Sequence, residues 1–303
     1  MISKKEPFLK FIRNLQNEIC TALETEDGKG KFISDKWERE GGGGGDTRVI
    51  SGGNIFEKGG VNTSAVHGNL PESLQKHLKI DKGNFFACGI SLVLHPYNPF
   101  VPTVHANFRY FELYDEIGEL ADQWFGGGSD MTPYYLYDED ATHFHQVQKT
   151  VCDKFHDDFY PTYKKKCDEY FYNSHRSESR GIGGTFFDYL RPTAEQDSQF
   201  WFDFVTGMGA AFLETYLPIV QKRKSISFTK KQKHWQEIRR GRYVEFNLIH
   251  DRGTLFGLKT KGRIESILMS LPPTVRWEYN LNPEAGSEED RLINVLKNPK
   301  AWV

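Results

Sequence analysis

Three prolines within seven residues constrain this chain more than any other feature. Pro96, Pro99 and Pro102 interrupt an otherwise apolar and aromatic segment. Because a proline fixes its φ angle and has no N–H to donate, this density excludes a helix and favours a short, extended connection. Residues 85–94 before it and 101–113 after it are rich in β-prone side chains. The sequence therefore predicts a strand, a rigid connection and a second strand.

The second of these strands carries a row of polar side chains. His105, Asn107 and Arg109 are spaced two residues apart, so they point to the same side of a sheet. An imidazole, an amide and a guanidinium in a row make a poor core and a good wall for an anionic ligand. His95 lies ten residues before His105, which leaves a metal-binding pair as the competing interpretation.

Length and composition limit the class of protein. The chain has 303 residues, enough for one large or two small domains, and its formal net charge of −2 gives no overall field that would attract nucleic acid. It contains no stretch of about 18 apolar residues. The four cysteines show no C-x-x-C spacing, and the N-terminus lacks the features of a signal or transit peptide. We therefore expect a cytoplasmic protein with reduced thiols.

Glycine-rich segments predict several turns. Gly41–Gly45 favours a flexible loop, with the alternative that its bare amides approach an anion close to Arg48. The glycines at 126–128 predict a turn or cap position for Asp130. The glycines at 181–184 lead into an aromatic strand rather than a helix, which excludes a Rossmann site, and no Gly-Lys-Ser/Thr completes a P-loop.

Periodicity defines the remaining elements. Helices are expected at 8–23, 138–149, 162–176, 195–222, 229–240 and near the C-terminus. Further strands are expected at 46–50, 61–68, within 180–190, at 243–248 and at 255–258, the last two joined by a turn at 251–254. The cluster Arg239–Arg242 is interpreted as a solvated helix end. Hairpin-joined strands and long amphipathic helices predict an α+β fold in a single domain, residues 1–303.

Five stretches of the chain resemble the oxygen-dependent coproporphyrinogen III oxidases. They are residues 42–50, 91–112, 124–133, 180–190 and 241–273. The resemblance implies a flat antiparallel sheet of about seven strands with helices on both faces. It also implies a homodimeric enzyme of haem biosynthesis that binds a tetrapyrrole. Such an enzyme converts the propionates on rings A and B of coproporphyrinogen III to vinyl groups, with O2 as oxidant and protoporphyrinogen IX, CO2 and H2O2 as products.

The same resemblance assigns roles to individual residues. The expected substrate-binding residues are Ser91, Asn107, Phe108, Arg109, Arg180, Lys261, Gly262 and Arg263. The expected catalytic residues are His105, Asp130 and Arg109. His105 is expected to donate a proton, and Asp130 to engage the pyrrole N–H groups and remove one of their protons. No organic cofactor is expected.

The sequence does not decide whether the protein binds a metal ion. His95, His105, His145 and His175 match histidines proposed as metal ligands in bacterial members of the family, although no H-E-x-x-H spacing supports a site. We expect that a divalent metal is not required. Two alternatives remain: a metal-dependent oxygenase or hydrolase built on these histidines, and a non-catalytic carrier of an anionic tetrapyrrole. The glycine run Gly41–Gly45 is the expected mobile lid.

Overall fold

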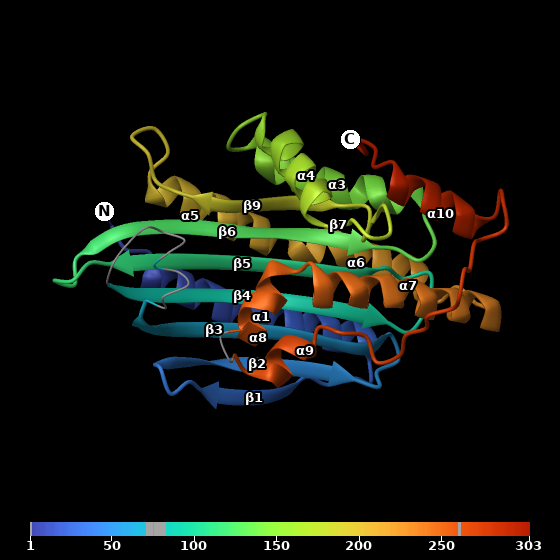
Figure 1. Ribbon diagram of the computed structural model, residues 1–303, viewed down its shortest axis with the longest axis horizontal. Coiled ribbons are helices and arrows are strands. Elements are labelled where there is room, and N and C mark those ends of the chain that lie inside the picture. Colours follow the sequence, from blue (N-terminus) through green and yellow to red (C-terminus); the bar gives the residue numbers. More distant parts are fainter. Residues whose placement is uncertain (1, 71–74, 76–82, 260–261) are drawn as a thin grey trace.

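A seven-stranded antiparallel sheet forms the centre of the molecule (Figure 1). The computed structural model describes residues 2–70, 75, 83–259 and 262–303. The strands are β1 (Ile33–Glu38), β2 (Gly43–Ser51), β3 (Phe56–Asn69), β4 (Asn84–Pro96), β5 (Thr103–Tyr114), β6 (Leu120–Thr132) and β9 (Gly184–Leu190). They lie in the order β1-β2-β3-β4-β5-β6-β9, and every neighbouring pair is antiparallel. The expected α+β class is confirmed.

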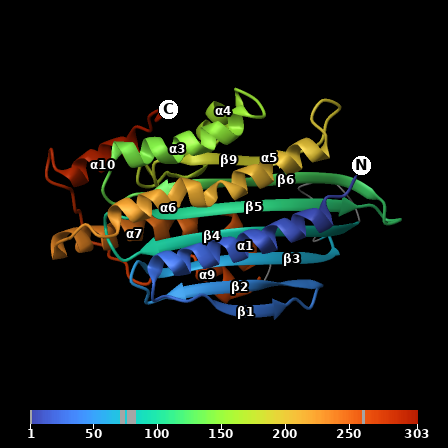
Figure 2. The same cartoon turned by 180° about the vertical axis from the view of Figure 1, so that it is seen from behind.

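One face of the sheet, which we call the α1 face, is covered along β3–β6 by helices (Figure 2). They are α1 (Lys5–Asp27), α5 (Ser198–Ala210) and α6 (Phe212–Arg223). Phe8, Ile12 and Leu15 of α1 are buried, and they belong to the same core cluster as Ile90 and Leu92 of β4. Each fully buried side chain of this kind contributes roughly 1.5–3 kcal/mol, which fixes α1 on the sheet through its apolar stripe.

The opposite face, which we call the site face, carries α8, α9 and the C-terminal half of α7 (Figure 1). These helices are α7 (Lys230–Ile249), α8 (Arg252–Lys259) and α9 (Ile264–Leu268). Thr47 Oγ1 lies 2.7 Å from Ser266 Oγ, and Lys58 Nζ donates to the carbonyl of Leu271 at 2.8 Å. These bonds tie α9 and the segment after it to β2 and β3.

The remaining elements lie beside β9 and toward the C-terminus. They are α3 (Asp138–Asp153), α4 (Phe159–Tyr170), the ribbon of β7 (Tyr172–Asn173) and β8 (Glu178–Ser179), and α10 (Glu288–Lys297). All four cysteines are buried and free of disulfides. Among the helices that the structure describes, none combines the length and the apolar character needed to cross a membrane.

The proline connection between β4 and β5 is not extended as predicted. Residues 97–101 form bends and a turn, in which the N–H of Val101 donates to the carbonyl of Asn98 at 3.1 Å, and buried hydrogen bonds hold the connection in place. Tyr216 Oη donates to the carbonyl of Pro102 at 2.9 Å, and Arg240 Nη2 donates to the carbonyl of Pro96 at 2.8 Å. Arg240 is fully buried. The prediction that Arg239–Arg242 forms a solvated helix end is therefore wrong, because this part of α7 packs against the end of the sheet.

The two strands predicted at 243–248 and 255–258 are also wrong. Helix α7 continues to Ile249, and residues 252–259 form α8. Tyr243, Phe246 and Asn247 are all buried, which places one stripe of the helix against its neighbours at a spacing of three and four residues. Over only six residues, the alternation expected of a strand and the three- and four-residue spacing expected of a helix fall on nearly the same positions. The local sequence therefore does not distinguish a strand from a helix here.

Two glycine segments predicted as turns are strands. Gly126–Gly128 lies within β6, and Gly43–Gly45 lies within β2, so the loop and lid predictions are wrong for these residues. A Cβ atom on Gly128 would lie 2.2 Å from the carbonyl oxygen of Thr185, and one on Gly45 would lie 2.4 Å from that of Thr63. The glycines permit close approach between strands rather than turning the chain. Strand β1 was not predicted.

The helix predicted at 195–222 is divided. Residue Ala211 separates α5 from α6. Pro218 lies inside α6 and has no N–H for the carbonyl of Glu214, four residues earlier. His143 Nε2 bonds to that carbonyl at 2.9 Å. The helix predicted at 162–176 ends at Tyr170, before the β7–β8 ribbon.

Candidate active site

The polar row predicted on β5 exists and faces the site side of the sheet. Asn107 pairs with Ser91 of β4, and His105 pairs with Asp130 of β6, so their side chains share one face. Phe108 lies between Asn107 and Arg109 in sequence and points to the α1 face, where it is buried in the core. The Phe108 side chain therefore does not belong to the site surface.

A buried chain of three side chains, which we call the centre, forms the middle of the site. His105 Nδ1 lies 2.8 Å from Asp130 Oδ1. Arg180 Nη2 donates to both oxygens of Asp130, at 2.8 and 2.7 Å. The side chains of Arg180 and Asp130 are each 2% exposed, whereas that of His105 is 23% exposed. Asp130 thus contacts the other two residues, and only His105 reaches solvent.

Aromatic rings and an amide fix the position of Arg180. Its guanidinium lies 4.1 Å from the centre of the Phe171 ring, 4.6 Å from Tyr243 and 4.9 Å from Phe246. Its Nη1 donates to Asn247 Oδ1 at 2.8 Å. These rings come from the segment after α4 and from α7, so the helical form of residues 243–249 is necessary for the site.

The electrostatics of the centre keep Asp130 ionised. Burial by itself would raise the pKa of Asp130, but the positive charge of Arg180 and the hydrogen bond from His105 outweigh it and lower the pKa. Both oxygens of Asp130 are occupied within the protein. Asp130 is therefore suited to orient His105, and poorly placed to take a proton from a ligand directly.

Two further arginine–aspartate pairs, which we call the rim pairs, lie on the same face. Arg109 Nη2 lies 3.0 Å from Asp188 Oδ2, and Arg109 Nη1 donates to Asn107 Oδ1 at 2.8 Å. Arg263 pairs with Asp35 of the edge strand β1. The side chains of Arg109 and Arg263 are 37% and 28% exposed. Both pairs are open to solvent, unlike the centre.

A row of polar side chains, which we call the polar floor, runs between the rim pairs, and α9 covers its β2 and β3 end through the bonds of Thr47 and Asn62 to Ser266. Ser91 and Asn107 continue across β3 and β2 as Asn62 and Thr47, since these four positions pair in succession. Sequence reasoning missed Asn62 and Thr47, although the alternation within 46–50 and 61–68 could have placed them on this face. Gly262 donates its N–H to the carbonyl of Gly257 at 2.8 Å. Lys261 lies outside the described residues.

The four histidines predicted as metal ligands are held by separate partners. His95 is buried and bonds to the carbonyl of Ser270 at 2.8 Å and to Thr103 at 3.2 Å. His145 is buried and bonds to the carbonyl of Ile182 at 3.1 Å. Its second ring nitrogen bonds to Tyr160 Oη at 2.9 Å, and burial lowers its pKa to about 3.

His175 takes part in a different cluster. It lies 2.8 Å from a Glu245 oxygen and 2.9 Å from His250 Nε2. Over the described residues, no group of three or more His, Cys, Asp or Glu side chains is arranged to hold a metal ion. Because His95 and His145 already use both ring nitrogens inside the protein, the four residues do not fit a common metal site.

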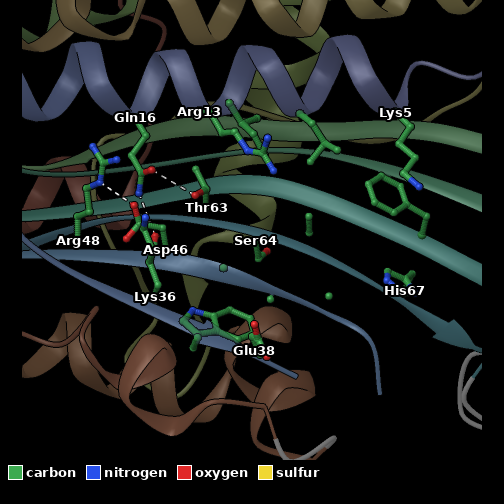
Figure 3. A pocket seen from close by; sticks show the side chains of 18 of the residues that line it. Lys5, Arg13, Gln16, Lys36, Glu38, Asp46, Arg48, Thr63, Ser64 and His67 are labelled. Carbon is green, nitrogen blue, oxygen red and sulfur yellow. Dashed lines mark hydrogen bonds and ion pairs between the residues drawn. The ribbon is translucent and has the colours of Figure 1, made fainter. Parts of the chain in front are cut away.

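A large groove of about 940 Å³ lies on the other side of the sheet, between α1 and strands β1–β3 (Figure 3). Arg13, Lys36 and Arg48 line it together with Gly43–Gly45. Gly44 and Gly45 are paired with strands on both sides, so the sheet takes up their backbone groups, and Arg48 pairs with Asp46 at 2.9 Å. The anion site predicted here is separated from His105 by the sheet itself.

The chain is similar to known proteins over nearly its whole length. The family model described as coproporphyrinogen III oxidase matches residues 7–302. The chain is 51% identical to the oxygen-dependent coproporphyrinogen-III oxidase, chloroplastic, of Glycine max and 50% identical to coproporphyrinogen-III oxidase 1, chloroplastic, of Arabidopsis thaliana. Each alignment covers 99% of this chain and 80% of the relative. A barley (Hordeum vulgare) relative with the same description as the first is 51% identical over 317 residues.

These relatives correct one prediction and support another. Their names place them in chloroplasts, which contradicts the cytoplasmic location predicted from the N-terminus. The names of the Glycine max and Hordeum vulgare relatives also specify an oxygen-dependent oxidase, and they favour neither the metal-dependent oxygenase or hydrolase nor the carrier. The chain therefore belongs to the coproporphyrinogen III oxidase family and is an oxygen-dependent oxidoreductase of haem biosynthesis.

Proposed function

We propose that the site face binds coproporphyrinogen III and converts the propionates on rings A and B to vinyl groups. For each propionate, one O2 is reduced to H2O2, the carboxylate leaves as CO2, and the side chain loses one hydrogen and gains a C=C bond. One proton is consumed in each round, because the carboxylate is anionic and the products CO2 and H2O2 are neutral. The observation that carries this proposal is the chain from Arg180 through Asp130 to His105 on that face.

In this proposal His105 handles protons and Asp130 positions it. His105 Nδ1–H donates to Asp130, and this hydrogen bond fixes the imidazole. Nε2 is therefore directed away from the carboxylate and is free to exchange a proton with the pyrrole N–H or with the product peroxide. Asp130 stabilises the imidazolium form as it develops. The role of proton acceptor that the sequence suggested for Asp130 thus passes to His105.

Substrate binding uses the rim pairs and the polar floor. Arg109 and Arg263 offer guanidinium groups that suit propionate carboxylates. Ser91 and Asn107 offer neutral hydrogen-bonding groups between them. Arg180 is too buried to reach a ligand carboxylate while it holds Asp130, so its proposed role is structural support of the centre.

The proposal is tested by incubating the protein with coproporphyrinogen III in air and under argon. Vinyl product, two CO2 and two H2O2 per molecule of protoporphyrinogen IX are expected in air, and none under argon. No vinyl product in air would overturn the proposal. Tight binding without oxygen consumption would instead indicate a carrier.

Neither a metal ion nor an organic cofactor takes part in the proposed reaction. The support is that His95 and His145 use both ring nitrogens within the protein. Protein treated with a chelator and passed through a desalting column is expected to keep its turnover rate. Loss of turnover that returns with one added divalent metal would contradict this part.

The proposed assembly is a homodimer. Leu248, Ile249, Leu258 and Ile264 are large apolar side chains with 41%, 53%, 38% and 57% of their surface exposed, and they come from the end of α7, from α8 and from the start of α9. Such a group of exposed apolar residues is typical of a protein–protein contact. Sedimentation should give twice the mass of the chain, and Ile249→Asp together with Ile264→Asp should give the single mass.

A further inference from the structure

Each of the three arginines on the site face that were predicted to bind substrate is already paired with an aspartate. The pairs are Arg109–Asp188, Arg180–Asp130 and Arg263–Asp35. Within each pair the two charges cancel, although the proposed ligand bears four carboxylates. These three arginines are therefore not free cations, and each carboxylate that binds one of them must share it with an aspartate or displace the aspartate.

The buried pair Arg180–Asp130 stays together, whereas the two more exposed rim pairs can exchange the aspartate for another carboxylate. Arg180 and Asp130 are each 2% exposed, and removing Asp130 from Arg180 would leave two uncompensated charges out of water. Asp188 and Asp35 are 23% and 54% exposed, so each can turn into solvent and keep its hydration. Exposed pairs of this kind are held by only about 0–1 kcal/mol.

The two exchangeable pairs also have a spacing that suits a large ligand. Asp35 is on β1 and Arg109 is on β5, four strand positions apart in the sheet, which corresponds to roughly 19 Å. Both pairs lie on the site face, since Asp35 is in register with Thr47 and Asn62, and Arg109 with Gly89. Gly126 leaves room for the Arg109–Asp188 pair, because a Cβ there would lie 2.6 Å from Asp188 Oδ1.

We propose that Asp188 and Asp35 are resident counter-ions, whose places on Arg109 and Arg263 are taken by propionate carboxylates of the substrate. Each exchange replaces one carboxylate by another, so a single carboxylate gains little. A ligand gains affinity only when several carboxylates and an apolar macrocycle bind together. Asp188 and Asp35 are thus specificity-determining residues that select against small acids. This inference rests on the proposed function for the identity of the ligand.

The test measures the binding of coproporphyrin III, the oxidised and unreactive tetracarboxylate, by fluorescence quenching. Asp188→Asn and Asp35→Asn each remove a competing charge and keep the size of the side chain. Binding is expected to become roughly two- to fivefold tighter in each variant, as expected for loss of a competing exposed pair. Asp153→Asn, which removes a similarly exposed partner of Lys149 on α3, should leave binding unchanged.

A double variant identifies the arginine as the shared partner. In an Arg109→Met background, Asp188→Asn should no longer tighten binding, whereas Asp35→Asn should still do so. Unchanged or weaker binding in both single variants would overturn the proposal, as would tightening by Asp188→Asn that persists without Arg109. Thermal melts of all variants confirm folding, and Asp35 on the edge strand provides a test that does not depend on Asp188.

Different measurements overturn the proposed function and the counter-ion proposal. Absence of vinyl product from the unaltered protein in air would overturn the proposed function, whatever the binding results. Normal formation of vinyl product together with unaltered dissociation constants in Asp188→Asn and Asp35→Asn would overturn only the counter-ion proposal.

Discussion

The centre and the rim pairs use the same two residue types for different purposes. In the centre, Arg180 and Asp130 are each 2% exposed, are joined by two short hydrogen bonds and are surrounded by aromatic rings. At the rim, Arg109 and Asp188 are 37% and 23% exposed and are joined at 3.0 Å. A buried pair cannot separate without leaving a charge out of water, whereas an exposed pair can. Burial, not residue type, therefore decides which arginine is a fixed support and which one is able to exchange its aspartate.

The largest effect is expected on turnover when the centre loses its carboxylate. Asp130→Asn keeps the shape of the side chain but removes the charge that orients and stabilises His105. The turnover number should fall by about 10²–10⁴, the range of a lost acid–base contribution, with KM changed only a few-fold. Steady-state oxygen consumption measures both constants. Full turnover with normal affinity would show that the centre is not part of the reaction.

The next effect concerns stability. Arg180→Met leaves Asp130 buried without its ion partner, and the free energy of unfolding should fall by about 3–5 kcal/mol. Lys149→Met is the matched control, since it breaks the exposed Lys149–Asp153 pair and should cost less than about 1 kcal/mol. Urea unfolding of both proteins measures the difference. Equal losses would contradict the distinction between buried and exposed pairs.

A smaller effect is expected on affinity at the rim. Arg109→Met removes a guanidinium that is proposed to bind a propionate. Because that propionate only replaces Asp188 on the arginine, the loss should be about 1 kcal/mol, or roughly fivefold in affinity. The turnover number at saturation should change far less than KM, because Arg109 does not contact the centre. Steady-state kinetics separates the two constants. A loss confined to the turnover number would indicate that Arg109 acts on the reacting atoms and not on substrate binding.

The pH dependence of stability should also distinguish the centre. The folded-state pKa of Asp130 is lowered, so the unfolded chain binds the proton first as the pH falls. The stability that Asp130 contributes is therefore present above its unfolded pKa of about 3.9, and is lost as the pH falls through the lower folded value. The stability difference between the unaltered protein and Asp130→Asn should shrink between pH 6 and pH 3 in urea titrations. A stability difference that stays constant over this pH range would contradict the lowered pKa of Asp130.

The smallest effect is expected for the stability of the rim. Asp188→Asn should change the free energy of unfolding by less than about 1 kcal/mol, and high salt should remove even that, because the pair is half-exposed. Urea unfolding at low and high ionic strength measures it. A loss comparable with that of Arg180→Met would mean that the rim pair is structural and not exchangeable.

Several parts of the site were predictable because they depend on short-range geometry. The alternation of β5 placed His105, Asn107 and Arg109 on one face, and the prolines fixed the strand before it. The family resemblance named Asp130 and Arg180 but not their contact, which joins residues 50 positions apart. The counter-ions Asp188 and Asp35 carried no signal, since a surface aspartate and a paired one look the same in a sequence.

Other predictions failed where distant packing overrides local pattern. Residues 243–248 alternate like a strand, yet they are helical because Tyr243, Phe246 and Asn247 pack together as one stripe. The glycines of β2 and β6 looked like turns, and their real constraint is a neighbouring strand that leaves no room for a Cβ atom. The position of that neighbouring strand cannot be read from the local sequence.

The sequence by itself determined the fold class, the family and the row of side chains on β5, since composition, periodicity and long matching stretches are properties of the chain alone. The tertiary structure decided which carboxylate meets which arginine, and how much water reaches each pair. That division has a physical cause. The strength of an ion pair and the direction of a pKa shift depend on distance and desolvation, and both arise only when separate segments pack together.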